Sequence, residues 1–349
     1  MWNVPTWAVE WTSMRNSAVL QWIYDRYERN IDVVAVTVVD TFDRSPYPAG
    51  SMMAIDRCER FEGSVSSGCV EVDLYERARS LFGEHPDTLV GIGCEIIDFD
   101  ADRSGRDPFA ASGPCRGTLR VAMHAVTPQH FPELATLVSS VQQGLPVTTF
   151  LNLRTGQMSL NWRGDAPMFR TDYKPKPRML IFGISDIATG LAALALPLGF
   201  AVTVCDPRPV FLQEERFVSA VKLVRDWPDR YLRCERKAGR INADTAIVDL
   251  THDDRFSIPL LIEALDSRRW SHSMHPAFVG ALGSSVRSTR KRHTLRQHGL
   301  LLDDVNRLQA PIGLDLGGRE APAITLSILA QVVAAREGGS GMPRSQLVD

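Results

Sequence analysis

The chain has 349 residues, which is enough for two domains that each bury a core. Its 39 Lys and Arg residues nearly balance its 41 Asp and Glu residues, so the net charge of −2 selects neither nucleic acid nor a membrane surface as a partner. We therefore expect no nucleic-acid partner and look for function in local sites.

The cysteines and the apolar runs indicate the compartment. Six cysteines are spread along the chain without a CxxC pair, which argues against structural zinc and a disulfide framework and fits reduced thiols. The first residues, MWNVPTWAVEWTSMRN, lack the features of a secretory signal. The longest apolar run, 191–204, is too short to span a bilayer. We expect a cytoplasmic protein without a membrane span.

The first 170 residues mix helical and strand patterns and are expected to form a smaller N-terminal α/β domain. Apolar spacing predicts helices over 8–30 and 70–85, and β-branched or alternating runs predict strands over 31–40, 51–65, 87–99 and 117–126. The polar, Gly-rich stretch 100–117 is predicted to be a long loop, a type that is more often functional or mobile than structural.

A linker is predicted over 171–178, TDYKPKPR, because two prolines spaced by lysine oppose helix. Beyond it strands and helices alternate, which predicts a Rossmann-like domain over 179–335 with a parallel sheet covered on both faces. The predicted strands and helices occupy 179–184, 185–199, 200–206, 245–252, 258–265 and 276–283. The tail 336–349 is expected to be disordered.

The stretch LIFGISDIATGLA resembles the first turn of a dinucleotide-binding unit, with Gly183 after a strand and Ser185 where a second glycine is usual. Asp186 would oppose a pyrophosphate at the helix N-terminus. In VTVCDPR, Asp206 has the spacing of an acid that binds ribose, and Arg208 follows it. Alternatively, the glycine only serves the βαβ turn, and the acid only ends a strand.

Two further groups of residues are expected at the carboxyl edge of the same sheet. His252 follows the strand that ends in DLTHDD. In VGALGSSVRSTRKR, the small residues Gly283 and Ser284 precede a basic helix that includes Arg290, an arrangement suited to a phosphate. The alternative is a solvated basic helix face.

The stretch GSVSSGCVE places one cysteine, Cys69, after the small residues Ser66, Ser67 and Gly68. A thiol near a helix N-terminus is favoured as a thiolate, so Cys69 is a candidate nucleophile or metal ligand. The alternative is a small buried hydrophobe. Arg44 and the turn that ends at Gly50 are expected to bring a cation and backbone amides toward the same place.

Taken in order, seven segments resemble the XdhC/CoxI family over nearly the whole chain: RSPYPAGSMMAI, GSVSSGCVE, LIFGISDIA, VTVCDPR, THDD, VGALGSSVR and RLQAPIGLDLGGREAPAITLSILAQV. The resemblance implies an accessory protein that binds the molybdenum cofactor, supports its sulfuration by a cysteine desulfurase and helps insert it into a xanthine dehydrogenase-type apoenzyme. It places Cys69 at the metal and its loop, from Gly63 to Glu71, at the cofactor. Ser67 stands where the family has glycine.

Three functions follow from these residues. The first is a maturation factor, a cofactor-binding chaperone rather than a turnover enzyme, with self-association as a homodimer left open. The second is an oxidoreductase that binds NAD(P) through Asp206, although no hydride-transfer set such as Tyr-x-x-x-Lys is apparent. The third is a degenerate scaffold of the same family, suggested by Ser67 and Asp186.

Overall fold

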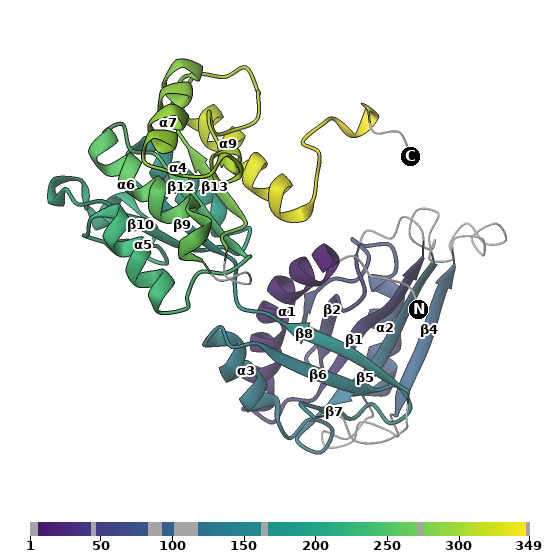
Figure 1. The fold of residues 1–349 in the computed structure, drawn as a ribbon. Helices are drawn as coiled ribbons and strands as arrows, with labels where there is room; N and C mark the ends of the chain where they lie inside the picture. Colours follow the sequence, from purple (N-terminus) through teal and green to yellow (C-terminus); the bar gives the residue numbers. More distant parts are fainter. Residues whose placement is uncertain are drawn as a thin grey trace. The chain divides into compact units, whose positions relative to one another are not determined.

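The computed structural model describes residues 6–42, 47–82, 93–100, 118–161, 167–270 and 275–346. The chain divides into two compact units, Met1–Pro175 and Lys176–Asp349 (Figure 1). A strand runs to Tyr173 and the next begins at Arg178, so the first residues predicted as linker, 171–173, belong to the first unit's structure. Arg44 and residues 101–117 of the predicted loop lie outside the described residues.

The first unit is built on a five-stranded antiparallel sheet with the order β3-β2-β1-β5-β4. Its long central strands are rich in β-branched residues, which suit a pleated surface that is buried on both faces. Ala35 of β1 pairs with Ala54 of β2 and with His124 of β5. The strands are β1 (Val33–Phe42), β2 (Met52–Asp56), β3 (Phe61–Gly63), β4 (Cys94–Asp100) and β5 (Thr118–Val126).

Each face of this sheet has its own core, because successive side chains of a strand point to opposite faces. Val33 and Ala35 pack with α1 (Thr6–Tyr27), α3 (Leu134–Gln142) and a three-stranded sheet ordered β7-β6-β8. Val34 and Val36 pack with α2 (Glu71–Leu81). The sequence did not predict the small sheet, whose strands are β6 (Val147–Asn152), β7 (Met158–Ser159) and β8 (Met168–Tyr173).

The second unit contains a six-stranded sheet with the order β11-β10-β9-β12-β13-β14, in which every pair is parallel. Numbered within the unit this is 3-2-1-4-5-6, the order of the doubly wound dinucleotide-binding fold. The predicted α/β class and parallel sheet are confirmed. The strands are β9 (Arg178–Phe182), β10 (Ala201–Cys205), β11 (Lys222–Val224), β12 (Thr245–Asp249), β13 (Phe278–Ala281) and β14 (Leu308–Gln309).

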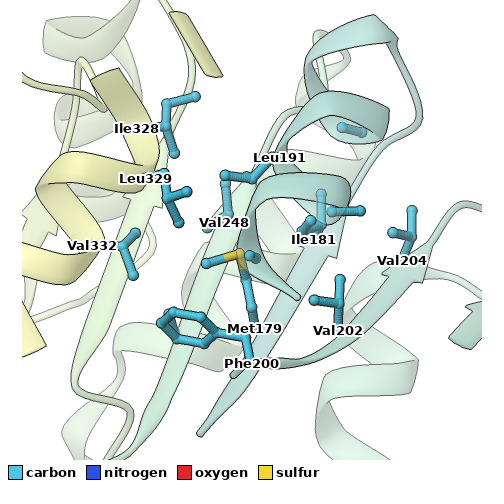
Figure 2. Packing of buried hydrophobic residues seen from close by; sticks show 14 of the residues in the cluster. Met179, Ile181, Leu191, Phe200, Val202, Val204, Val248, Ile328, Leu329 and Val332 are labelled. Atoms are coloured by element: carbon cyan, nitrogen blue, oxygen red, sulfur yellow. The ribbon is translucent and has the colours of Figure 1, made fainter. Parts of the chain in front are cut away.

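Helices cover both faces of the parallel sheet. On one face, Met179 and Val248 pack against Leu191 of α4 (Asp186–Ala195) and Ile328 of α9 (Ala321–Glu337) (Figure 2). The opposite face packs against α5 (Pro228–Lys237), α6 (Asp254–Leu265), α7 (Ser285–Gln297) and α8 (Leu302–Asn306). Because α9 runs to Glu337 and a 3-10 turn covers Arg344–Gln346, part of the tail predicted to be disordered is ordered.

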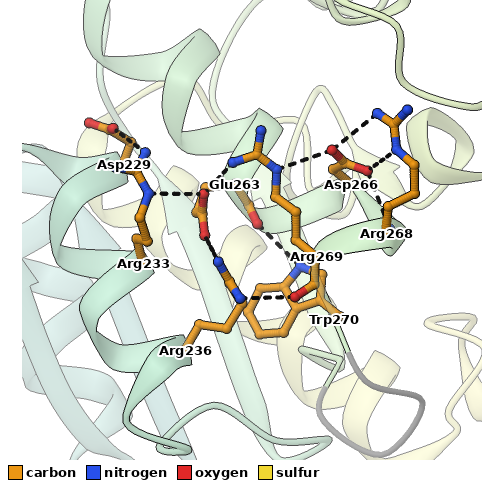
Figure 3. A network of polar contacts seen from close by, with 8 residues as sticks. All are labelled: Asp229, Arg233, Arg236, Glu263, Asp266, Arg268, Arg269 and Trp270. Atoms are coloured by element: carbon orange, nitrogen blue, oxygen red, sulfur yellow. Dashed lines mark hydrogen bonds and ion pairs between the residues drawn. The ribbon is translucent and has the colours of Figure 1, made fainter.

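An arginine network joins α5 to α6 around one buried carboxylate (Figure 3). Glu263 of α6 is fully buried and accepts hydrogen bonds from Arg236 at 2.8 Å, Arg269 at 2.6 Å and Arg233 at 3.4 Å. The indole of Trp270 donates to the Glu263 carbonyl at 3.1 Å. A buried carboxylate needs such partners, so this network fixes the two helices against each other.

We expect Glu263→Gln to lower the free energy of unfolding of the second unit by about 2–4 kcal/mol, because three guanidinium groups lose their shared buried counter-charge. The fluorescence of the nearby buried Trp270 during urea unfolding reports the change. The control is Glu215→Gln, at an exposed position, which should leave the midpoint unchanged. Equal midpoints for Glu263→Gln and the unmodified chain would contradict the expectation.

Candidate functional site

The loop that carries Cys69 is folded around the carboxylate of Glu71, the first residue of α2. One carboxylate oxygen accepts hydrogen bonds from the Ser64 hydroxyl at 2.6 Å and from the amides of Val65 and Ser66 at 3.0 and 2.7 Å. The other accepts from the Ser66 hydroxyl and from the Gly68 amide at 2.8 Å. Glu71 therefore organises the loop from the inside.

These contacts keep Glu71 ionised. Burial by itself would raise its pKa, but the hydroxyls of Ser64 and Ser66 and the loop amides outweigh burial and lower the pKa to about 2. The polar groups of the loop donate to this carboxylate, so Glu71 acts as a support for the loop. A direct contact between Glu71 and a cofactor stays a prediction.

Ser67 and Gly68 both adopt a backbone conformation with positive φ, at 66° and 106°. Serine tolerates this region at a cost, whereas glycine adopts it freely. Ser67 thus takes the left-handed conformation that a glycine could take there. Among the described residues, no heavy atom other than those of Gly68 and its two chain neighbours lies within 4 Å of the position that a Cβ on Gly68 would occupy, so there is open space beside this part of the loop.

Cys69 is exposed, two residues before the start of α2. It is therefore not the packed core thiol of the alternative interpretation. Cys205 is of that kind, since burial raises the pKa of its thiol to about 12, and partial burial raises the pKa of the half-buried Cys94 to about 11. An exposed thiol beside open space can reach a bound molecule, which the buried ones cannot.

Two of the predicted glycines hold the backbone of the first unit in place, one through close packing and one through a hydrogen bond. A Cβ on Gly63, whose φ is +87°, would lie 2.4 Å from the Met52 carbonyl oxygen and 2.7 Å from Val19. The Gly50 carbonyl accepts a hydrogen bond at 2.7 Å from the buried side chain of Asn16. Both positions anchor the backbone, and their direct contact with a cofactor stays a prediction.

In the second unit, the turn after β9 is packed tightly, and an aspartate, Asp186, follows it at the start of α4. A Cβ on Gly183 would lie 3.0 Å from the amide nitrogen of Thr251, so the turn fits closely against the segment after β12. Ser185 caps α4 by accepting from the Ala188 amide at 3.4 Å. Asp186 extends from the first turn of α4, is 85% exposed and pairs with Arg216 at 2.8 Å.

Asp206 is buried at the end of β10, and its carboxylate is occupied by protein groups. One oxygen accepts from the Arg208 amide and the Arg208 Nε, both at 2.9 Å. The other accepts from the Ile184 amide at 2.9 Å and from the Arg208 guanidinium at 2.7 Å. Burial opposes ionisation, but these donors lower the pKa of Asp206. A ribose hydroxyl would have to displace Arg208 to reach it.

A buried ion pair that the sequence did not predict lies at the end of β12. Asp249 accepts from the Thr251 amide at 2.9 Å, the Thr251 hydroxyl at 2.6 Å, the Ser257 hydroxyl and the ammonium group of Lys291 at 3.2 Å. Both charged side chains are buried. The lysine of the RSTRKR run was the one signal in the sequence, but helical spacing alone did not separate it from its exposed neighbours.

The segments after β12 and β13 meet through an arginine. The guanidinium of Arg287 donates to the carbonyl of the exposed His252 at 3.0 Å. Ser284 caps α7 by accepting from the Arg287 amide at 3.3 Å, and Gly283 precedes it. Arg290 is exposed one turn further along the helix.

The sheet order explains which predicted residues come together. Strands β10, β9, β12 and β13 are neighbours, so the segments that follow them meet at one carboxyl edge. The Cys69 loop forms a second group in the first unit. Among the residues that the structure describes, no three His, Cys, Asp or Glu side chains are grouped so that they could hold a metal ion. Within that same part of the chain, none of the helices is both long and apolar enough to cross a membrane.

Two compact units, one with an exposed thiol on a carboxylate-anchored loop and one with a doubly wound parallel sheet, define a two-domain protein with a Rossmann domain. Residues 179–332 match the XdhC Rossmann domain, and residues 27–93 match the XdhC and CoxI family. The chain belongs to the XdhC and CoxI family, which confirms the resemblance found in the sequence.

Relatives and a solved structure are similar over most of the chain. The molybdenum cofactor insertion chaperone PaoD of Escherichia coli (strain K12) is 25% identical over 311 residues, 87% of this chain and 83% of the relative. A protein of Bacillus subtilis (strain 168) that is named as a probable xanthine dehydrogenase subunit is 24% identical, covering 88% and 94%. The crystal structure of a xanthine dehydrogenase from Bacillus halodurans shares the fold, with a TM-score of 0.73 at 22% identity over 96% and 98% of the two chains.

We expect Glu71→Gln to destabilise the first unit in a pH-dependent way. The folded pKa of about 2 lies below the ordinary 4.5, so the charged carboxylate stabilises the fold above pH 4.5, and this contribution is lost as the pH falls toward 2. Allowing for partial exposure, the difference at pH 7 is about 1–2 kcal/mol. Urea unfolding at pH 7 and pH 3 should show it shrinking, whereas the exposed Glu76→Gln should show no such trend.

Ser67→Gly and Gly68→Ala should shift stability in opposite directions. Relief of the left-handed serine is expected to raise the free energy of unfolding by up to about 1 kcal/mol, while alanine at Gly68 lowers it by about 1 kcal/mol although nothing crowds its Cβ. Thermal unfolding of the two variants beside the unmodified chain measures both effects. A loss of stability in Ser67→Gly would show that the serine hydroxyl, not the backbone, matters there.

Proposed function

We propose that the protein binds a molybdenum cofactor as cargo, assists its sulfuration and helps insert it into a xanthine dehydrogenase-type apoenzyme. The names of the two relatives, at 25% and 24% identity over most of the chain, support this role. The observation within the molecule that carries it is the exposed Cys69 on a loop held rigidly by Glu71.

Cys69 is the residue proposed to contact the metal or its sulfur. A thiolate is a soft ligand of the kind that such metals accept, and the open surface beside Gly68 leaves room for an organic ligand. Since the described residues hold no cluster of three metal-binding side chains, the cofactor would have to bring its other ligands with it. This suits a cargo that is received and passed on.

The proposed partners follow from the same role. A cysteine desulfurase supplies the sulfur, the apoenzyme accepts the finished cofactor, and a homodimer is the proposed assembly. The proposal places the chain in the cytoplasm, where the free thiols expected from the sequence stay reduced. Binding and release require no chemical turnover by this chain.

The alternative of an NAD(P)-dependent oxidoreductase has less support from the site. Arg208 and Ile184 fill the hydrogen-bonding positions of Asp206 that a ribose would use. Asp186 adds negative charge to the first turn of α4, where a pyrophosphate would bind. The scaffold alternative loses one of its arguments, because Ser67 adopts the left-handed conformation open to glycine.

The cofactor-binding role is tested by Cys69→Ser in the full chain, purified from a host that makes the molybdenum cofactor. We expect bound molybdenum and pterin to fall at least about fivefold, because an alcohol is a far poorer ligand for a soft metal than a thiolate. Elemental analysis and pterin fluorescence after oxidation measure the two contents. The control is Cys58→Ser, since Cys58 is also exposed in the first unit.

Two outcomes would contradict the proposal. Equal cofactor content in Cys69→Ser and the unmodified chain would remove the thiol from the site. A lack of cofactor in the unmodified chain, even with its apoenzyme absent from the host, would favour the scaffold alternative.

A further inference from the structure

We propose that the second unit binds a phosphate or pyrophosphate group at the turn between β13 and α7, residues 282–288, and not at the turn between β9 and α4 where dinucleotide-binding folds place it. The inference rests on the proposed function only in identifying this phosphate or pyrophosphate group as part of the molybdenum cofactor. The site itself is argued from the contacts of the two turns.

The turn after β9 is closed to an anion by the protein's own carboxylates. Asp206 already accepts the hydrogen bond of the Ile184 amide, one of the amides that would face a phosphate. Asp186 places a second carboxylate in the first turn of α4. The N-terminus of α6, after β12, likewise holds Asp254 in its first turn and Asp253 as its cap. Asp186 and Asp253 are paired with arginines, so what distinguishes these two helix ends is that carboxylates already accept amides which an anion would need.

The N-terminus of α7 differs from both. This helix has 13 residues and no acidic residue in its first turn. The first amides of a helix lack partners within the helix, and the Ser284 hydroxyl takes up that of Arg287. The amides of Ser285 and Val286 are thereby left at the helix end, where the dipole favours negative charge. Val286 is 81% exposed, so access to this end is open.

A buried hydroxyl points independently to a ligand at this turn. Ser288 is only 3% exposed, and within the described part of the chain its Oγ has no hydrogen-bond partner. The atom lies 3.7 Å from the position that a Cβ on Gly283 would occupy. The space left by the missing side chain of Gly283 is thus lined by an unsatisfied donor. A buried hydroxyl without a partner is costly, and an anionic oxygen would satisfy it.

The charged groups around the turn favour an anion. Arg287 is held against the His252 carbonyl, and Arg290 is exposed on the same helix. The ammonium group of Lys291 lies 3.4 Å from the Leu282 carbonyl, although Asp249 balances its charge. The facing carboxylate of Asp253 is paired with Arg255. The excess charge therefore comes from Arg287 and Arg290.

The test compares two serines that each cap a helix at the same sheet edge, Ser284 of α7 and Ser185 of α4. Aspartate is an equally good cap, so Ser284→Asp and Ser185→Asp keep their helices while adding one negative charge. Calorimetric titration of the full chain with inorganic pyrophosphate at physiological ionic strength is expected to show binding weakened about tenfold or more by Ser284→Asp. Ser185→Asp should change it less than about threefold.

A second variant tests the buried hydroxyl. Ser288→Ala should weaken pyrophosphate binding at least about threefold without lowering the thermal stability of the chain, because the hydroxyl has no partner to lose. Pyrophosphate binding that is unaffected by Ser284→Asp, or that is lost in Ser185→Asp instead, would overturn the proposal. So would a chain that binds no pyrophosphate at millimolar concentration.

Pyrophosphate binding and molybdenum content distinguish a failure of this anion site from a failure of the proposed function. Pyrophosphate binding that depends on Ser284 in a chain without molybdenum would keep the anion site and reject the cargo. Molybdenum retained through Cys69, together with pyrophosphate binding indifferent to Ser284, would keep the cargo and reject this site.

Discussion

The carboxylate of Glu71 is the contact on which the Cys69 loop depends. A seven-residue connection between β3 and α2 has little secondary structure of its own, so its backbone amides need acceptors. Glu71 supplies acceptors from the first turn of the following helix, and the hydroxyls of Ser64 and Ser66 donate to the same carboxylate while accepting from two further loop amides. The loop is therefore shaped by one half-buried charge, and the thiol it presents is held in a defined position without being buried.

In the second unit, too, carboxylates accept hydrogen bonds from neighbouring groups of the chain, but they do so at the sheet edge. Asp206 follows β10 and Asp249 ends β12, the two strands on either side of β9, at the sheet edge where acids of this fold often face a ligand. Here their oxygens accept from neighbouring amides, hydroxyls and cations of the chain. The edge is internally bonded at these two acids, whereas the first turn of α7 contains no acidic residue.

The sequence predicted the parallel sheet because β-branched and apolar runs such as MLIFGI are bounded by glycine and polar residues, a pattern that leaves few alternatives. It missed α5, whose segment PDRYLRCERK is mostly charged and has only a narrow apolar stripe, which packs into the core through Tyr231 and Leu232. It located Cys69 but not its exposure, and Asp206 but not its occupation by Arg208 two residues on. The exposure of Cys69 and the hydrogen bonds of Asp206 depend on side-chain directions and on tertiary contacts. The spacing of residue types along the sequence does not encode either.

The buried pair of Asp249 and Lys291 has a mechanical consequence. Asp249 is bonded at once to Thr251 in the segment after β12, to Ser257 in α6 and to Lys291 in α7. These three pieces cannot shift separately without breaking a charge-assisted contact in a low-dielectric interior. The sheet edge is therefore preorganised, and a ligand that binds there meets a surface whose conformational entropy was already lost on folding.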